Sequence, residues 1–388
     1  MSAPGGSVWS TLVGQASSID HLRRACEGAS MTHAWLFVGP PGSGRSNAAS
    51  AFAAGLQCEA GTGCGACGAC RTVLAGTHPD VTVVRTDKLT IGVDDVRDLV
   101  RRSALTPTTA RWQILLVEEA DRLTDPACNA LLKAIEEPNA HTVWLLCAPT
   151  TEDLLPTIRS RCRLVSLATP TLAEVSEFLV RVHAVAPPLA AYAARASQGH
   201  IGRAKALATD EATRNRRQEI VKLPARLKNL GSALNAAANI LDVARDEAAA
   251  ITAALDAQEK ADIDAAYGVE QRGRRPREYG PALTALERMQ KTRAKRRVLD
   301  VVDRSLMDLV SVYRDAVTIS VGGGVGLINE EIRPEVEGVA RRVPPETLLR
   351  MIDAIFVART QMLEFNVGPQ LALESMVVGL QLPSRERT

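Results

Sequence analysis

Short apolar runs of strand type alternate with segments of helical spacing along the first part of the chain. The clearest runs, each made of β-branched and large apolar residues, are residues 35–38, 81–84, 114–117 and 143–146. Strands that are separated by helices favour parallel pairing, with the helices covering both faces of the sheet. The pattern therefore predicts a doubly wound α/β domain with a parallel sheet over residues 1–167.

The strand signals stop after Pro170, and Ala-rich and Leu-rich segments with helical spacing follow it. They predict a small helical domain over residues 168–222 and a longer all-α domain over residues 223–388. A Gly- and Arg-containing stretch over residues 267–281 predicts an exposed loop between helices, at the start of a basic insertion over about residues 267–297. We therefore expect three domains.

Composition and charge limit the class of protein. Hydrophobic residues make up 46% and charged residues 23%, which is enough apolar material for a folded core. No run of about 18 apolar residues is present, so we expect no membrane-spanning helix. The net charge of +2 and the aromatic content of 3% provide no overall sign of nucleic-acid binding or base stacking. The start lacks the layout of a secretory signal, so we expect a cytoplasmic protein with reduced or metal-bound cysteines.

A glycine-rich loop follows the first predicted strand and precedes an Ala-rich helix. It has the spacing of a P-loop, in which glycines let backbone N–H groups approach phosphates, except that Arg45 replaces the lysine. Because arginine is longer and planar, hydrolysis should suffer more than binding. The alternative is a Gly-rich turn that holds no ligand. The predicted phosphate-binding residues are Gly39, Pro40, Pro41, Gly42, Ser43, Gly44, Arg45 and Ser46.

Acidic residues follow the predicted strand at 114–117. Glu118 stands where a Walker B strand would place the aspartate near Mg²⁺, and Glu119 stands where a glutamate would activate water. The extra methylene of Glu118 shifts its carboxylate by about 1.5 Å, which octahedral Mg²⁺ tolerates badly. The sequence therefore predicts a degenerate Walker B motif and leaves Mg²⁺ binding open.

Four of the eight cysteines are clustered as C-x₅-C-x₂-C-x₂-C: Cys58, Cys64, Cys67 and Cys70. Four thiolates suit one tetrahedral Zn²⁺, and the small residues between them allow tight turns whose amides point at the sulfurs. An iron–sulfur cluster and unliganded thiols are the alternatives. We predict a structural zinc module over residues 58–70.

Two further motifs carry a resemblance to a known family. Residues 129–138 and 154–162 are similar to those of bacterial clamp-loader AAA+ subunits, whose ATPase domain is an α/β P-loop domain. The degenerate ATP site and residues 366–374 resemble delta-prime subunits of DNA polymerase III more than tau/gamma subunits. The resemblance is strong over residues 8–208 and weaker beyond. It implies an AAA+ domain, a helical lid, a helical collar that joins five subunits in an open ring, and zinc at the cysteines.

The resemblance also implies residue roles. In clamp loaders, the arginine of the Ser-Arg-Cys motif reaches the ATP of the neighbouring subunit, so Arg161 is expected to be a trans arginine finger. Arg203 lies where the family's lid presents an arginine to nucleotide, and Pro149 replaces a polar sensor residue. ATP or ADP binding is expected to be weak or absent, and the chain alone is not expected to be an active ATPase.

The expected function is that of a non-hydrolysing stator in DNA replication. Its partners would be tau/gamma and delta subunits in a hetero-pentamer, the sliding clamp, and primer–template DNA through the complex, at the cytoplasmic replisome. An active tau/gamma-like ATPase is one alternative, which Arg45 and Glu118 together oppose. A zinc-dependent DNA-binding module is the other, based on the cysteines and the basic stretch between residues 272 and 297.

Overall fold

The computed structural model describes residues 7–29, 31–86, 90–267 and 276–381. The chain forms two compact units, Met1–Thr209 and Asp210–Thr388, which we describe separately. None of the helices described combines the length and the apolar character that a membrane crossing needs.

The first unit is built on a five-stranded parallel sheet with the order β2-β3-β4-β1-β5. The four predicted strands are present, and the structure adds a fifth at one edge. That edge strand alternates exposed and buried positions and has only one fully buried residue, Val165, so it lacks the continuous apolar run of a central strand. The strands are β1 (Ala34–Val38), β2 (Val81–Val84), β3 (Gln113–Val117), β4 (Thr142–Ala148) and β5 (Arg163–Ser166).

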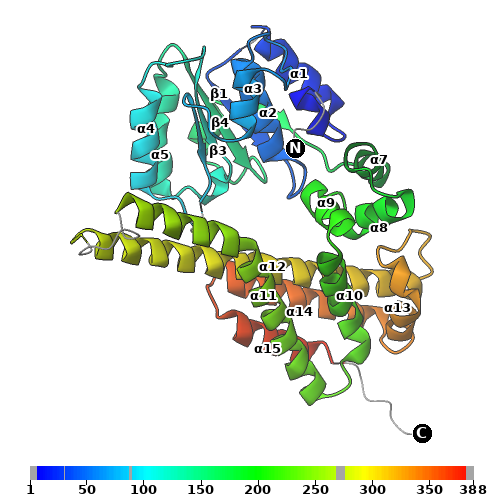
Figure 1. Ribbon diagram of the computed structural model, residues 1–388. Coiled ribbons are helices and arrows are strands. Elements are labelled where there is room, and N and C mark those ends of the chain that lie inside the picture. The colour runs from blue at the N-terminus through cyan, green and yellow to red at the C-terminus, as the bar shows by residue number, and fades with distance from the viewer. Residues whose placement is uncertain (1–6, 30, 87–89, 268–275, 382–388) are drawn as a thin grey trace, which may run out of the picture. The chain divides into compact units, whose positions relative to one another are not determined.

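Helices cover both faces of this sheet, as predicted (Figure 1). Successive residues of a strand point to opposite faces, so Trp35 and Phe37 join one core while Leu36 and Val38 join the other. The first face carries η1 (Val8–Thr11), α1 (Ala16–Cys26), α2 (Arg45–Gln57) and α3 (Gly68–Leu74). The second face carries α4 (Val93–Ser103), α5 (Asp125–Glu136) and α6 (Pro156–Arg159), and the short η2 (Ala120–Arg122) follows β3. The α/β fold class is confirmed.

Three helices complete the first unit around a hydrophobic cluster of their own. They are α7 (Leu172–His183), α8 (Pro187–Ser197) and α9 (Ile201–Thr209). A capping box starts α7, where Thr171 and Glu174 satisfy each other's backbone N–H groups. The separate cluster is consistent with the predicted helical lid that follows residue 167, and that division stays a prediction.

The second unit begins earlier than the predicted boundary at residues 222 and 223. Asp210 caps α10 (Glu211–Arg226) by accepting hydrogen bonds from the N–H groups of Ala212 and Thr213. Pro224 does not separate domains, because it is accommodated near the end of α10 and is itself buried. The boundary at residues 222 and 223 for the start of the helical collar stays a prediction.

The second unit is all-helical, as predicted for the C-terminal region. It contains α10, α11 (Leu230–Ala266), α12 (Tyr279–Ser320), η3 (Glu330–Ile332), α13 (Arg333–Ala340), α14 (Pro345–Leu363) and α15 (Pro369–Gly379). The expected loop is shorter than predicted, because α12 already starts at Tyr279, whose hydroxyl donates to Asp264 at 2.7 Å. Three predicted basic residues, Arg272, Arg274 and Arg275, lie outside the described residues.

Candidate functional site

The four clustered cysteines converge on one point at the start of α3. The Sγ atoms of Cys58, Cys64, Cys67 and Cys70 all lie within 4.8 Å of one another, and none forms a disulfide. Sulfurs about 2.3 Å from a tetrahedral Zn²⁺ lie about 3.8 Å apart, so this arrangement fits one zinc ion. The predicted ligand set is thus brought together by the fold.

Backbone amides point at these sulfurs. The N–H groups of Cys64, Cys67 and Cys70 donate to the Sγ atoms of Cys58, Cys64 and Cys67, each at 3.4 Å. Burial opposes ionisation of Cys58, but amide hydrogen bonds from Cys64, Ala60 and Thr62 outweigh it and lower its pKa to about 6. Burial raises the pKa of Cys70 instead, so the hydrogen bonds favour the thiolate at Cys58, and a bound cation would be needed to favour it at Cys70.

The cysteine loop is fastened to the N-terminal segment. The indole N–H of Trp9 donates to the Thr62 carbonyl at 3.0 Å, and the Val8 N–H donates to the Gly63 carbonyl at 3.0 Å. Gly63 has φ +69°, and a Cβ there would lie 2.7 Å from Val8 and 2.8 Å from Trp9, so a larger residue does not fit. The cysteine loop is therefore part of the packing of the α/β domain.

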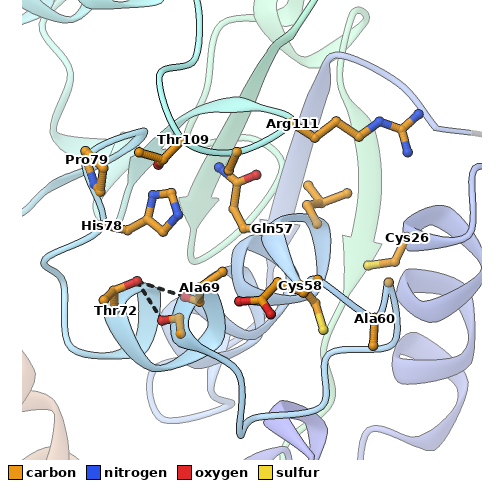
Figure 2. A pocket seen from close by; sticks show the side chains of 15 residues that line it. Cys26, Gln57, Cys58, Ala60, Ala69, Thr72, His78, Pro79, Thr109 and Arg111 are labelled. Carbon is orange, nitrogen blue, oxygen red and sulfur yellow. Dashed lines mark hydrogen bonds between the residues drawn. The ribbon is translucent and has the colours of Figure 1, made fainter.

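An open groove of about 940 Å³ lies beside the module (Figure 2). Cys58 and Thr72 line it on the module's side, and Gln57, His78 and Arg111 line it on the other. Several of these polar groups already have partners: the Gln57 amide exchanges two hydrogen bonds with the backbone of Trp112, and His78 Nδ1 accepts from the Asp80 N–H. We assign no ligand to the groove.

The glycine-rich loop connects β1 to α2, in the strand–loop–helix context that a P-loop needs. The Arg45 guanidinium folds back on the loop, where Nη1 donates to the Gly39 carbonyl at 2.7 Å. Burial lowers the pKa of Arg45. The arginine that replaces the usual lysine thus has a partner within the loop.

The start of α9 contacts this loop inside the first unit. A Cβ at Gly42 would lie 2.6 Å from the Cα atom of His200, and the Ile201 N–H lies 3.4 Å from the Gly42 carbonyl. Arg203, the predicted phosphate contact, lies on α9 one turn beyond His200, and its backbone N–H donates to His200 Nδ1. The start of α9 therefore packs on the loop where the sequence predicted phosphate binding.

The two carboxylates of the predicted Walker B motif are both engaged in ion pairs. Glu118 lies 2.9 Å from Arg85, which follows β2, and Glu119 lies 3.1 Å from Arg122. The Pro149 carbonyl, at the end of β4, accepts from the Gly39 N–H at 3.1 Å. The role of Arg85 was not predictable from the sequence, because its pairing depends on the neighbouring position of β2 and β3 in the sheet.

Arg161 lies on the surface between α6 and β5. Its Nη2 lies 2.7 Å from Glu136 Oε1 at the end of α5, and its Nη1 donates to the Thr157 carbonyl at 2.8 Å. The side chain keeps 39% of its surface exposed. Glu136 was not predicted to have a role, although it belongs to the motif of residues 129–138. The fold therefore joins the two family-like motifs at one surface position.

Part of this chain is similar to known subunits of DNA polymerase III. Residues 14–171 match the family model described as DNA polymerase III, delta subunit. The DNA polymerase III subunit delta' of Pseudomonas aeruginosa is 38% identical over 180 residues, which cover 45% of this chain and 51% of that protein. The DNA polymerase III subunit gamma/tau of Mycobacterium tuberculosis is 36% identical over 154 residues, 39% of this chain and 27% of that protein.

A solved structure, the gamma subunit-related protein of Thermotoga maritima, superposes with a TM-score of 0.35 at 17% identity, over 75% of this chain and 98% of that chain. The superposition is too poor to support an inference. The sequence match spans about half the length of the delta' relative. Over part of its length, which includes residues 14–171, this chain is therefore similar to DNA polymerase III subunits of the delta' and gamma/tau types.

Proposed function

We propose that this chain is a delta-prime-type clamp-loader subunit that does not turn over ATP and presents Arg161 to ATP held by a neighbouring subunit. The observation that carries the proposal is a difference between the ion pairs of the Walker B carboxylates and those of Arg161. Both Walker B carboxylates are held by arginines of the same domain, while Arg161 keeps exposed surface beside a single carboxylate.

The degenerate site favours the absence of hydrolysis in this subunit. A magnesium ion near Glu118 would have to displace the Arg85 guanidinium, and the carboxylate is already displaced by its extra methylene. Arg45 offers a planar fork in place of the compact ammonium that lies between β- and γ-phosphates. These features weigh against the tau/gamma-like ATPase alternative.

The contacts of Arg161 favour a role toward a partner's nucleotide. Glu136 and the Thr157 carbonyl hold the guanidinium in one orientation, which lowers the entropy cost of a later contact. Because phosphate and carboxylate bind the same guanidinium fork, an incoming phosphate would replace Glu136 as the acceptor. The cation would then stabilise the charge that develops in phosphoryl transfer.

The proposed setting is a ring of subunits in the cytoplasm. The partners are tau/gamma and delta subunits in a hetero-pentamer joined through the helical second unit, together with the sliding clamp and primed DNA. The cysteine cluster would hold a structural Zn²⁺ that fixes the segment of residues 58–70 and takes no part in hydrolysis.

The test compares reconstituted complexes that contain wild-type chain, Arg161→Ala, Arg161→Lys or the matched control Arg159→Ala. Arg159 is the last residue of α6, two positions before Arg161, and is 42% exposed, with a longer ion pair to Glu152 at 3.7 Å. The measurement is steady-state ATPase with clamp and primed DNA, at verified subunit stoichiometry, and also for each chain alone.

We expect negligible ATPase for the chain alone, a reduced rate for the Arg161→Ala complex, partial rescue by lysine, and no change for the control. A trans arginine is worth about 10³-fold or more in kcat at its own site, diluted here by interfaces that keep their arginines. Equal rates in all complexes would refute the trans role. Turnover by the isolated chain that Arg45→Ala abolishes would instead favour the ATPase alternative.

A further inference from the structure

Helices α11 and α12 form a long antiparallel hairpin in the second unit. Contacts between them run in opposite directions along the two helices: Asp264 with Tyr279, Glu259 with Arg293, and Glu247 with Arg304. Figure 1 shows the joined ends of the pair extending past α14 and α15. We call residues 251–266 with residues 279–297 the distal hairpin.

The distal hairpin is held by a narrow seam between its two helices. On α12 its buried residues are Tyr279, Leu286 and Arg293, spaced by seven residues as in a coiled coil. The Arg293 guanidinium is buried and bonds the carboxylates of Asp256 and Glu259, with Nη1 to Glu259 Oε1 at 2.9 Å. The acidic side chains of α11 that face α12 are therefore used inside the hairpin.

Three cations lie on the opposite side of α12. Arg288, Lys291 and Lys295 are exposed, and none of them forms an ion pair within the part of the chain that the structure describes. At about 100° per residue they fall on one side of the helix, turned by about 140–160° from Arg293. Their backbone positions span about 10 Å along the axis. We call these three residues the cationic stripe.

Nearby acids do not neutralise the stripe. Glu287 is exposed and one turn before Lys291, without an ion pair between them in the described structure. Asp300 lies instead near Arg296 and Arg297, at 4.0 and 3.8 Å. Like charges one turn apart on a helix disfavour each other, so this arrangement is stabilised when a polyanion binds.

We propose that the cationic stripe binds the phosphate backbone of duplex nucleic acid without reading its sequence. A duplex carries about one charge per 1.7 Å of axis, so a straight row of cations about 10 Å long faces several phosphates. Base stacking is not favoured, because Tyr267 and Tyr279 of the hairpin pack on each other. The proposed function makes primed DNA a partner of the whole complex, and this inference goes beyond it by assigning a direct contact to three residues of this chain.

The test uses the full chain and a fluorescent 30-base-pair duplex of arbitrary sequence, with binding measured by anisotropy between 50 and 200 mM NaCl. The variant is Arg288→Gln, Lys291→Gln and Lys295→Gln together. The matched control removes three exposed cations of the same unit: Lys228→Gln, Arg341→Gln and Arg350→Gln. Circular dichroism checks that both variants are as folded as the wild type.

Three phosphate contacts predict that the slope of log affinity against log salt is shallower by about 2.7 in the stripe variant. Wild type and control should share the steeper slope. Between 50 and 200 mM NaCl they should therefore lose about 40-fold more affinity than the stripe variant loses. Equal binding by stripe variant and control would overturn the proposal. Competition by polyglutamate as effective as that by unlabelled duplex would also overturn it, in favour of an acidic protein surface. No ATPase measurement enters, so failure here leaves the proposed function untouched.

Discussion

Replacing the half-buried ligand Cys64 with alanine should release the metal and loosen the N-terminal part of the α/β domain. Cys26 provides the matched control, because it is also half-buried and lies near Cys58 without belonging to the ligand set. Cys26→Ala therefore removes a sulfur beside the module but leaves all four candidate ligands in place.

The structure sets the size of the effect. Ordering one residue's backbone costs about 1–2 kcal/mol of conformational entropy. Keeping the ten residues 58–67 ordered therefore costs about 10–20 kcal/mol, which we expect bound metal to offset. Their other anchors include the hydrogen bonds from Trp9 and Val8, each worth about 1 kcal/mol. If the loop unfolds, Val8 and Trp9, now 3% and 2% exposed, lose their cover.

Burial of one large apolar side chain is worth about 1.5–3 kcal/mol, so exposure of both costs the first unit about 3–6 kcal/mol. At about 2–4 °C per kcal/mol for a unit of this size, this loss should lower the melting temperature by about 6–24 °C. The larger value of about 10–16 kcal/mol for zinc-finger peptides does not apply, because this unit has two other hydrophobic cores that contain none of the four cysteines.

The assay combines metal analysis of reductively purified protein with thermal unfolding followed by circular dichroism. We expect about one zinc per chain in wild type and Cys26→Ala, and loss of both zinc and stability in Cys64→Ala. Hydrogen exchange should speed up first at residues 58–67. Wild-type protein without zinc, or with iron and sulfide, would refute the assignment, and unchanged melting after zinc loss would refute the packing argument.

Two further predictions concern buried charges. The Arg217 guanidinium lies 3.2 Å from Asp308 and 2.7 Å from Glu331, and Arg217→Ala removes this cation from both carboxylates. Urea unfolding should show a loss of about 3–5 kcal/mol in the free energy of unfolding. An unchanged urea midpoint would contradict this. Burial raises the pKa of Asp80, but hydrogen bonds from Thr108 and Thr109 outweigh it and hold the pKa below its ordinary value. The ionised carboxylate therefore adds to the free energy of unfolding above about pH 4, and this contribution is lost as the pH falls. Asp80→Asn should lower the free energy of unfolding at pH 7 by about 1–3 kcal/mol. The variant should also lose less stability than the wild type between about pH 4 and 2. Parallel pH profiles for the two proteins would exclude this role of Asp80.

Features set by near neighbours in the chain were predictable from the sequence. The central strands follow from continuous apolar runs, and the P-loop context of residues 39–46 follows from glycines between a strand and a helix. The four cysteines lie within thirteen positions, so any compact folding of residues 58–70 keeps their sulfurs close. Short-range geometry leaves few alternatives in such segments.

Pairings between distant residues were decided by the tertiary structure alone. The partners of Glu118 and Arg161 are Arg85 and Glu136, which come near only once β2 pairs with β3 and once α5 packs near α6. The basic stretch after residue 267 did not indicate which cations form ion pairs within the chain. In the hairpin, Arg293 faces α11 and pairs with Glu259, while the cationic stripe faces away from α11. Sequence determined which residues carry charge, but the packing of one element on another determined which charges are neutralised, because Coulomb attraction and desolvation depend on distances that only the folded chain sets.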